Sequence, residues 1–333
     1  MLKRVISLSL CILMIATTAL TFCSCKGEDS KEYPVTVANV TIEKEPMNIV
    51  VLSDCLADII SYMGYDVKMV GRSTETDQEF LSVVPIVGTA SDPNVNAIVS
   101  SETDLIIADS SLSENSKKSL AATSIPVLTL EKANSFEELK ALYTNLGTAL
   151  GGAVSGKKQG IDSYDELIKT ISDFKDAIPQ EAVRSACYLY LNENGELCTL
   201  TKGTIEYELF SYNGAINVFN SQETPQVDLE LLKISTPTFI FYDDQAVLDY
   251  LNNDINLSNM GALKNDKTYQ VKKTDFYRQG TTYEELIYRM IEFMFITSEA
   301  TQDEATPDDV TTTEALGEAE SETSTDVIAV FSD

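Results

Sequence analysis

The chain has 333 residues, of which 52 are acidic and 24 are basic, so its formal net charge at pH 7 is −28. This charge repels nucleic acids and anionic lipid head groups, which argues against both as partners. The sequence contains no histidine. That absence excludes histidine-based catalytic triads, histidine general bases and the usual histidine-ligated metal sites.

The first segment of the chain is hydrophobic and has a basic start. Two basic residues precede a run, residues 5–22, that contains no charged residue. This pattern is typical of a secretory signal, and no basic cluster follows that would hold a spanning helix in the membrane. The segment resembles a bacterial lipoprotein signal, in which Cys25, or alternatively Cys23, becomes lipidated. We therefore expect a signal over residues 1–25 and a lipid-anchored protein on the extracytoplasmic face of the cell membrane.

Two polar segments flank the part of the chain that can fold. Residues 26–46 lack helical periodicity and are expected to form a tether that ends in a short edge strand. Between residues 298 and 333 there are eleven acidic residues and no basic residue. Such a segment cannot bury enough apolar surface to offset the entropy lost on ordering. We therefore expect residues 297–333 to form an acidic, disordered tail.

Residues 47–151 alternate apolar runs with helical segments. Residues 48–53 form a nearly continuous apolar run, which is typical of a strand buried on both faces, and the helical sequence after it stops at Gly64. Further apolar runs follow at 67–73, 84–90, 103–110 and 125–131. This order predicts a parallel α/β lobe. Ser135 and Glu138 form a capping box that begins the next helix.

The pattern changes at residue 152. Apolar residues within 152–178 recur at helical spacing, which predicts one helix of about five turns at 3.6 residues per turn. Residues 179–296 again alternate apolar runs with helical segments and predict a second α/β lobe. The fold class is therefore α/β, with two Rossmann-like lobes that one long helix joins.

The sequence "GGAVSGKK" at residues 151–158 nearly matches a phosphate-binding loop. That motif requires a serine or threonine after its lysine, to bind magnesium, and it follows a strand. Here Lys158 occupies that position, and the preceding segment is helical. We interpret residues 151–158 as a glycine-rich joint between two helices.

Three cysteines lie beyond the signal, namely Cys55, Cys187 and Cys198. Three thiols cannot form a complete set of disulfides, and a bond between Cys187 and Cys198 stays open. Cys55 lies in the first turn of a predicted helix, where a thiol pKa falls. Because the chain has no histidine partner for it, we interpret Cys55 as a packed cysteine.

The order of these segments resembles the iron-siderophore and cobalamin binding proteins of ABC importers. A strand that ends in serine and opens a helix (residues 48–54), a Val-Gly run (70–71), and a Pro-Asn segment that begins a helix (93–94) carry the resemblance. Residues 225–242 resemble the matching helix and strand of the second lobe, and the similarity covers roughly 47–296. The resemblance implies two lobes on a helical backbone, a ligand in the cleft between them, and lobe movements of small amplitude.

The resemblance also implies partners. In that family, a glutamate on each lobe pairs with arginines of the permease, whose ATPase drives uptake. Glu230 matches the position in the second lobe, whereas Asn96 occupies the position in the first lobe. This departure keeps a second interpretation open, in which a surface lipoprotein of the same fold acts as a sensor or scaffold without transport. We expect a monomer that is not an enzyme and needs no cofactor.

Candidate ligand contacts are the polar residues that follow predicted strands, because open α/β sheets bind ligands at the carboxyl ends of their strands. They are Ser53, Asp54, Arg72, Thr74, Ser91, Asp92 and Ser110 in the first lobe and Lys202, Thr204, Tyr242, Tyr277 and Arg278 in the second.

Only four arginines lie beyond the signal, and Arg72 and Arg278 fall on these loops. Guanidinium groups pair with oxyanions, which favours a ligand with anionic or strongly accepting groups, and the tyrosines suit a large macrocyclic or aromatic chelate. The alternative is that each arginine neutralises a carboxylate such as Asp109 or Asp275.

Overall fold

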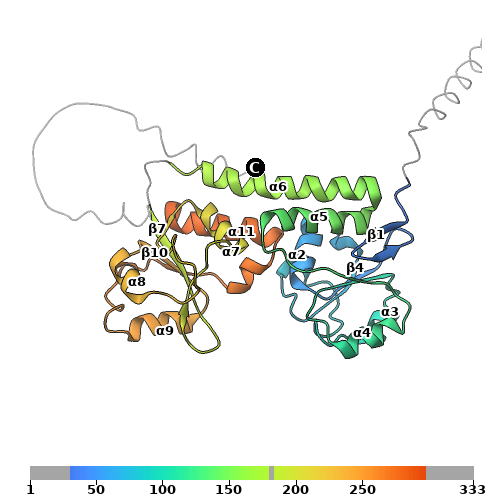
Figure 1. Cartoon of the computed structure of the whole chain (residues 1–333), viewed down its shortest axis with the longest axis horizontal. Coiled ribbons are helices and arrows are strands. Elements are labelled where there is room, and N and C mark those ends of the chain that lie inside the picture. Colours follow the sequence, from blue (N-terminus) through green and yellow to red (C-terminus); the bar gives the residue numbers. More distant parts are fainter. Residues whose placement is uncertain (1–30, 180–183, 298–333) are drawn as a thin grey trace, which may run out of the picture.

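The computed structural model describes residues 31–179 and 184–297. Figure 1 shows two α/β lobes side by side, with the helix α6 lying across both of them. The predictions of a signal, of a lipidated Cys25 and of an acidic tail lie outside the described residues. Within the described part, none of the helices is both long enough and apolar enough to cross a bilayer.

The first lobe is a four-stranded parallel sheet with strand order β4-β3-β5-β6. Its strands are short, and the two central strands β3 and β5 are fully buried, as the apolar runs predicted; helices cover both faces of the sheet. The strands are β3 (Ile49–Val51), β4 (Met69–Arg72), β5 (Leu105–Ala108) and β6 (Val127–Thr129). The helices are α2 (Asp54–Tyr62), α3 (Val95–Ser100), α4 (Glu114–Ala121) and α5 (Phe136–Gly151), with 3₁₀ turns at Asp66–Lys68 and Glu79–Leu81.

The apolar run at residues 84–90 does not form a strand. Its backbone makes only isolated bridges, from Ile86 to Arg72 and from Gly88 to Pro93. Pro85 has no N–H group to donate to a ladder, which explains why regular pairing stops there. The segment therefore folds as a loop over the carboxyl end of β4.

The two central helices meet at the glycine-rich joint. A π-helix, Gly152–Gly156, connects α5 to α6 (Lys157–Asp176), so the helix expected over residues 152–178 begins with one wider turn. A Cβ atom at Gly160 would lie 2.2 Å from the carbonyl oxygen of Tyr143, and one at Gly147 would lie 2.3 Å from that of Gly156. Glycine at these positions lets α5 and α6 pack backbone against backbone.

The second lobe has a mixed sheet with strand order β11-β10-β7-β8, and β9 also pairs with β7. Only β8 runs antiparallel to its neighbour, because a tight hairpin connects it to β7. The strands are β7 (Ser185–Leu191), β8 (Leu197–Cys198), β9 (Ile216–Asn217), β10 (Phe239–Tyr242) and β11 (Thr268–Gln270). The α-helices are α7 (Ile205–Phe210), α8 (Leu229–Ser235), α9 (Gln245–Asn253), α10 (Gly261–Lys264) and α11 (Thr281–Ile291), with 3₁₀ turns at Ser211–Asn213 and Lys273–Tyr277 and a π-helix at Glu292–Thr297.

Part of the expected tether is folded. The strands β1 (Val35–Val37) and β2 (Val40–Ile42) form an antiparallel hairpin, and Val35, Val37 and Ile42 are buried in the core. Ala38 and Asn39 have φ angles of 45° and 65°, the left-handed region that two-residue hairpin turns require. The alternation of valine with polar residues buries one face of the hairpin, so this segment belongs to the first lobe.

One hydrophobic core connects the lobes. It contains residues of α2 and α5 from the first lobe, of α6, and of α7 and α11 from the second. Tyr143 and Tyr283 are fully buried within it. Each large side chain buried in this way contributes about 1.5–3 kcal/mol, so the continuity of this core resists separation of the lobes.

Candidate ligand-binding cleft

Side chains that follow the strands of the two sheets meet between the lobes. Lys132, which comes after β6, has its Nζ 3.1 Å from a carboxylate oxygen of Glu206 in α7. The same Nζ lies 4.7 Å from the centre of the Tyr277 ring, within the range of a cation–π contact. Lys132 therefore reaches from the first lobe to two side chains of the second.

A pocket of about 170 Å³ lies beside this contact. Lys273 lines it and places its Nζ 3.7 Å from the centre of the Tyr190 ring. We call it the tyrosine pocket, and its lining is Tyr190, Thr199, Leu200, Thr201, Thr204, Glu206, Lys273, Phe276 and Tyr277. Three aromatic residues, three threonines and charged groups of both signs therefore line one small space.

A larger groove of about 540 Å³ lies between the lobes on the side of the edge strands β4 and β11. Gln78 is 7% exposed, and its Oε1 is buried without a hydrogen-bond partner. Such an atom has space for a donor from a ligand or from water. We call this the inter-lobe groove, and its lining is Asp77, Gln78, Glu79, Phe80, Gln270, Lys272, Asp275, Arg278, Thr282, Glu285 and Arg289.

Residues 278–282 bind the second lobe to the first, and we call this segment the clamp. It begins with Arg278, whose Nε lies 3.2 Å from Oδ2 of Asp54 and whose other nitrogen pairs with Asp77. Burial raises the pKa of Asp54, and the Arg278 guanidinium opposes that change. The ion pairs therefore hold a partly buried carboxylate of α2 against the second lobe.

Gln279 continues the clamp and is fully buried. Its Nε2 donates to the carbonyl of Ala133 at 2.7 Å, and its Oε1 accepts from the N–H of Ala133 at 2.8 Å. The hydroxyl of Tyr143 donates to the carbonyl of Gln279 at 2.9 Å. The side-chain amide thus pairs with the backbone of the other lobe as a strand would.

Asp58 completes the clamp from the first lobe. Its Oδ2 accepts from the N–H groups of Gly280 at 2.7 Å and Thr282 at 3.2 Å, and its Oδ1 accepts from the Thr282 hydroxyl at 3.0 Å. Asp58 therefore caps the first turn of α11, although it lies 222 residues away in the chain. Burial raises its pKa to about 7, and the three donors oppose the rise.

Gly280 is required by this contact. A Cβ atom there would lie 2.4 Å from the carbonyl oxygen of Asp58. Any larger residue would push α11 away from α2.

Comparison of the sequence with models of known protein families identifies the family of this chain. A model described as "Periplasmic binding protein" matches residues 49–274. The chain belongs to the periplasmic binding protein family. The family and the two-lobed α/β fold that the sequence predicted are both confirmed.

Two curated relatives of Bacillus subtilis align over most of this periplasmic binding protein. An uncharacterized ABC transporter substrate-binding lipoprotein is 26% identical over 80% of this chain and 88% of its own length. An Fe(3+)-citrate-binding protein is 23% identical over 76% of this chain and 82% of its own length. A crystal structure of a possible iron-binding, periplasmic solute-binding protein from Staphylococcus epidermidis is 17% identical, has a TM-score of 0.62, and covers 76% of this chain and 100% of the other.

Several predicted ligand residues of the first lobe are occupied by local contacts. Ser53 is 2% exposed and caps α2 through Leu56. Arg72 is also buried, and its guanidinium donates to the carbonyls of Val84, at 2.9 Å, and of Thr76. Arg72 therefore supports the 73–84 loop, and it pairs with neither Asp109 nor Asp275 in this structure.

Four other predicted residues of the first lobe are exposed, namely Thr74, Ser91, Asp92 and Ser110. The hydroxyl of Ser110 donates to Glu131 at 2.7 Å. The two residues follow the neighbouring strands β5 and β6, and Glu131 directly precedes Lys132 in the chain. Asp92 accepts from Ser116 in the first turn of α4 at 3.1 Å, so its carboxylate is bonded within the first lobe. Ser110 is thus the one of these four that a contact links to the loop carrying Lys132.

The second lobe divides its predicted residues between two faces of the sheet. Thr204 and Tyr277 line the tyrosine pocket. Tyr242 packs against the cluster formed by α8 and α9, and Lys202 is exposed. Tyr242 ends β10, whereas Tyr277 ends the 3₁₀ turn that follows β11, so the two tyrosines do not meet in one pocket.

The three described cysteines are free and buried. The Sγ of Cys55 lies 3.6 Å from Oε1 of Gln279, and burial raises the pKa of its thiol well above the usual value. Cys55 is therefore a packed thiol, as the sequence indicated. The bond between Cys187 and Cys198 is not formed.

Sequence reasoning missed four residues of this region: Asp58, Lys132, Tyr190 and Gln279. Lys132 directly follows a predicted strand, so the rule that selected Ser110 could also have selected it. Asp58 is the one acidic residue in the otherwise apolar stretch "LADII" at residues 56–60. A carboxylate in such a stretch is expected to be buried, and a buried carboxylate requires hydrogen-bond partners.

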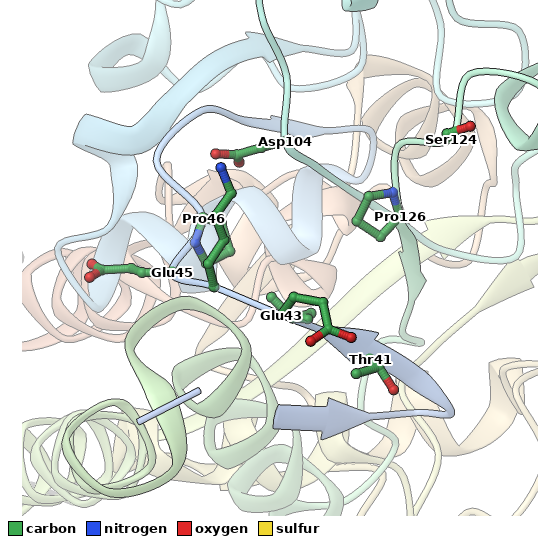
Figure 2. Close-up of a pocket in the computed structure, with 9 residues that line it drawn as sticks. Thr41, Glu43, Glu45, Pro46, Asp104, Ser124 and Pro126 are labelled. Atoms are coloured by element: carbon green, nitrogen blue, oxygen red, sulfur yellow. The ribbon is translucent and has the colours of Figure 1, made fainter. Parts of the chain in front are cut away.

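A further pocket, of about 340 Å³, lies at the opposite edge of the first sheet. Figure 2 shows Pro46 beside Asp104 on one wall and Pro126 with Ser124 on the other. Asp104 accepts from the N–H groups of Met47, at 2.9 Å, and of Asn48. These contacts hold the start of β3, and the pocket lies at the amino ends of the strands, away from the inter-lobe groove.

Proposed function

We propose that the protein is an extracytoplasmic solute receptor that delivers a metal chelate, such as an iron-siderophore or a corrinoid, to an ABC importer. Membership of the periplasmic binding protein family supports a binding function rather than catalysis. The names of the curated relatives support an importer and an iron chelate. The observation that carries the proposal is the tyrosine pocket of the second lobe, beside which side chains that follow β6 and β11 meet across the lobe boundary.

The size of the pocket bears on how a ligand enters. Ligand sites are typically about 300–1,000 Å³, which is larger than the 170 Å³ of the tyrosine pocket. Lys132 crosses the boundary beside it, so displacement of Lys132 from Glu206 would enlarge the space. We propose that Lys132 moves when the ligand binds and that Thr204 and Tyr277 then contact the ligand.

The role of Arg278 follows from its partners. Its guanidinium already pairs with Asp54 and Asp77. An anionic ligand would therefore compete with two carboxylates for it. We propose that Arg278 and Asp54 form the floor of the inter-lobe groove, and the other predicted ligand contacts remain predictions.

Transport requires a docking surface for the permease. Glu230 is exposed in the first turn of α8 and forms an ion pair with Lys233 at 3.1 Å. Asn96 is exposed on α3 of the other lobe. We propose that Glu230 meets the permease, and the neutral Asn96 favours the second candidate function, a sensor or scaffold without transport.

The proposal includes a membrane anchor. The substrate-binding relative is named a lipoprotein. We propose that lipidated Cys25 holds a monomer at the outer face of the cell membrane, where the permease and its ATPase receive the ligand. Two or more acyl chains give stable anchoring, since each buried methylene contributes about 0.8 kcal/mol.

A thermal-shift screen tests the proposed function. Wild-type protein and the variant Tyr277→Ala are melted with a corrinoid, a ferric siderophore and haem. One ligand should raise the Tm of the wild type by several degrees and raise that of Tyr277→Ala much less, because ligand binding stabilises only the folded state. Equal shifts in both proteins would place the site elsewhere, and no shift with any of the three would contradict the proposed ligand class.

A further inference from the structure

The inter-lobe groove has an apolar wall in addition to its polar lining. Phe80, which lines the groove, is 40% exposed. The same loop also exposes Val83 and Ile86, which are 87% and 53% exposed. Three large apolar residues are therefore exposed within residues 80–86 of a chain whose net charge is −28. Apolar surface that is concentrated in this way is typical of a binding site.

Backbone hydrogen bonds hold this loop in place. The N–H of Arg72, the last residue of β4, donates to the carbonyl of Pro85 at 2.9 Å, and the N–H of Val87 donates to the carbonyl of Arg72 at 2.9 Å. The second lobe holds the loop as well, because Arg278 pairs with Asp77. The apolar wall is therefore preformed, which reduces the entropy lost when a ligand binds.

The charged groups of the groove neutralise one another. Four carboxylates and three cationic side chains line it, which gives the lining a formal charge of −1. Arg278 is paired with two carboxylates, and Arg289 lies 3.6 Å from Oδ2 of Asp275. This pairing removes the attraction for anions that the two arginines would otherwise exert. Glu79 and Glu285 are exposed in the lining and repel an anionic ligand.

The groove also contains a hydrogen-bond acceptor that lacks a donor. The Nε2 of Gln78 donates to the carbonyl of Asp54 at 3.3 Å, whereas its Oε1 is buried without a partner. Leaving a buried acceptor unpaired is unfavourable, and an N–H group of a bound ligand would satisfy it. Ionised carboxylates offer no such donor, whereas amide groups do.

The size and position of the groove suit a ligand larger than the tyrosine pocket can hold. Its volume of about 540 Å³ lies within the range of about 300–1,000 Å³ that is typical of ligand sites. The groove and the tyrosine pocket share one 3₁₀ turn, Lys273–Tyr277, because Asp275 lines the first and Tyr277 lines the second. A ligand in the groove is therefore adjacent, through this turn, to the proposed contact at Tyr277.

We propose that the inter-lobe groove binds an electrically neutral chelate with amide N–H donors and an apolar face, in preference to a polycarboxylate chelate. The apolar face lies against Phe80, and an amide of the ligand donates to Gln78. Corrinoids with amide side chains and peptide-based ferric hydroxamates belong to this class, which differs from the ligand named for one curated relative, Fe(3+)-citrate. The inference rests on the proposed receptor function and names the ligand class within it.

Calorimetric titration with four chelates tests the ligand class. Cyanocobalamin and ferrichrome are neutral and carry amides, whereas ferric citrate and haem carry carboxylates. We expect one neutral chelate to bind at least about tenfold more tightly than either carboxylate chelate, because like charges then do not face each other across the groove. Equal affinities, or tighter binding of ferric citrate or haem, would overturn the inference and leave the receptor function standing. Binding of none of the four would contradict the proposed function, and the inference with it.

Two variants test whether the ligand lies in the groove. Phe80→Ala should weaken binding of the neutral chelate by about fivefold or more, because the aromatic contact is lost. Val67→Ala is the control, since Val67 is 85% exposed in the turn before β4, and it should leave the affinity unchanged. Gln78→Leu, which removes the acceptor, should also weaken binding by about fivefold. Unchanged affinity in Phe80→Ala would place the ligand elsewhere, and unchanged affinity in Gln78→Leu would refute the amide hydrogen bond.

A charge variant tests why neutral chelates are preferred. Glu79→Gln combined with Glu285→Gln changes the formal charge of the lining from −1 to +1. The preference for the neutral chelate should then fall by about threefold or more. Glu43→Gln combined with Glu102→Gln changes the total charge of the chain equally at two exposed positions outside the groove, and it should keep the preference. Equal effects of the two double variants would show that the charge of the groove does not select the ligand.

Discussion

The clamp and the tyrosine pocket lie on the same boundary between the lobes, yet they are built differently. In the clamp, Asp58 and Gln279 are fully buried and bonded to backbone groups of the other lobe. Beside the pocket, the side chain of Lys132 is 39% exposed and makes one ion pair and one ring contact. A buried, satisfied network is costly to open, whereas a single ion pair with a partly exposed lysine costs less to break. The difference indicates that the clamp fixes the lobes and that the pocket is the part that can change.

The largest expected effect comes from breaking the clamp with Asp58→Ala. The N–H groups of Gly280 and Thr282 lose their acceptor inside the core, and each unsatisfied group costs about 1–3 kcal/mol. We expect the free energy of unfolding to fall by about 3 kcal/mol or more, measured by urea denaturation.

Asp228→Ala is the matched control for this change. Asp228 caps α8 through the N–H groups of Glu230 and Leu231, but it is exposed. Water can replace its carboxylate, so we expect a loss of about 1 kcal/mol. Equal losses in the two variants would contradict the special role assigned to the clamp.

Arg72→Ala should have the next largest effect on stability. Its guanidinium binds backbone carbonyls of its own loop, and hydrogen bonds of a charged group contribute about 1.5–3 kcal/mol. The structure therefore predicts a lower Tm and unchanged ligand affinity in the folded fraction. The interpretation of Arg72 as a ligand contact predicts at least tenfold weaker binding with an unchanged Tm. Calorimetric titration and thermal melting of Arg72→Ala and Arg72→Lys distinguish the structural role of Arg72 from a role in ligand binding.

The pH dependence of stability offers a second way to examine the clamp. The pKa of Asp58 in the folded protein is about 7, above the value of about 3.9 for an unfolded aspartate. Between these values the folded state binds more protons than the unfolded state, so the contribution of Asp58 to stability falls as pH rises from about 4 to about 7. Urea denaturation at several pH values measures the free energy of unfolding of the wild type and of Asp58→Asn. The wild-type value minus the variant value should decline as pH rises from about 4 to about 7. A difference that rises with pH would mean that the three hydrogen bonds outweigh burial.

The smallest effect on stability is expected for Lys132→Ala. Lys132 is partly exposed, and we expect its single ion pair to contribute about 1 kcal/mol, so the variant should fold normally. If the ligand must displace Lys132, its removal should strengthen binding by up to about fivefold. Lys140→Ala is the control, because Lys140 pairs with Asp165 and lies over the Tyr164 ring on the outer helices. Weaker ligand binding in Lys132→Ala would make Lys132 a ligand contact instead of a gate.

The sequence predicted the parts of the fold that depend on local patterns. Continuous apolar runs marked β3 and β5, and the helix cap at Ser135 followed directly from the chain. The alternation of valines with polar residues at 35–42 is consistent with the observed hairpin. The polar composition of the surrounding residues led instead to the prediction of a tether.

The clamp could not be predicted in the same way. Asp58 and Gly280 are partners across 222 residues, and no local pattern specifies that distance. The partners of Arg72 are backbone carbonyls, which every residue carries, so sequence identity does not reveal them. The candidate site was therefore predicted as a region, at the ends of strands, and only partly as residues, because side-chain partners depend on how the two lobes meet.

The distance between the lobes tests the central claim most directly. Spin labels at Val83→Cys in the first lobe and Ile255→Cys in the second, both highly exposed, report it by pulsed electron paramagnetic resonance. We predict a single narrow distribution in the wild type, the same distribution in Lys132→Ala, and a broad one in Asp58→Ala. A broad distribution in the wild type, or broadening by Lys132→Ala but not by Asp58→Ala, would contradict the assignment of the fixed and changeable parts of the boundary.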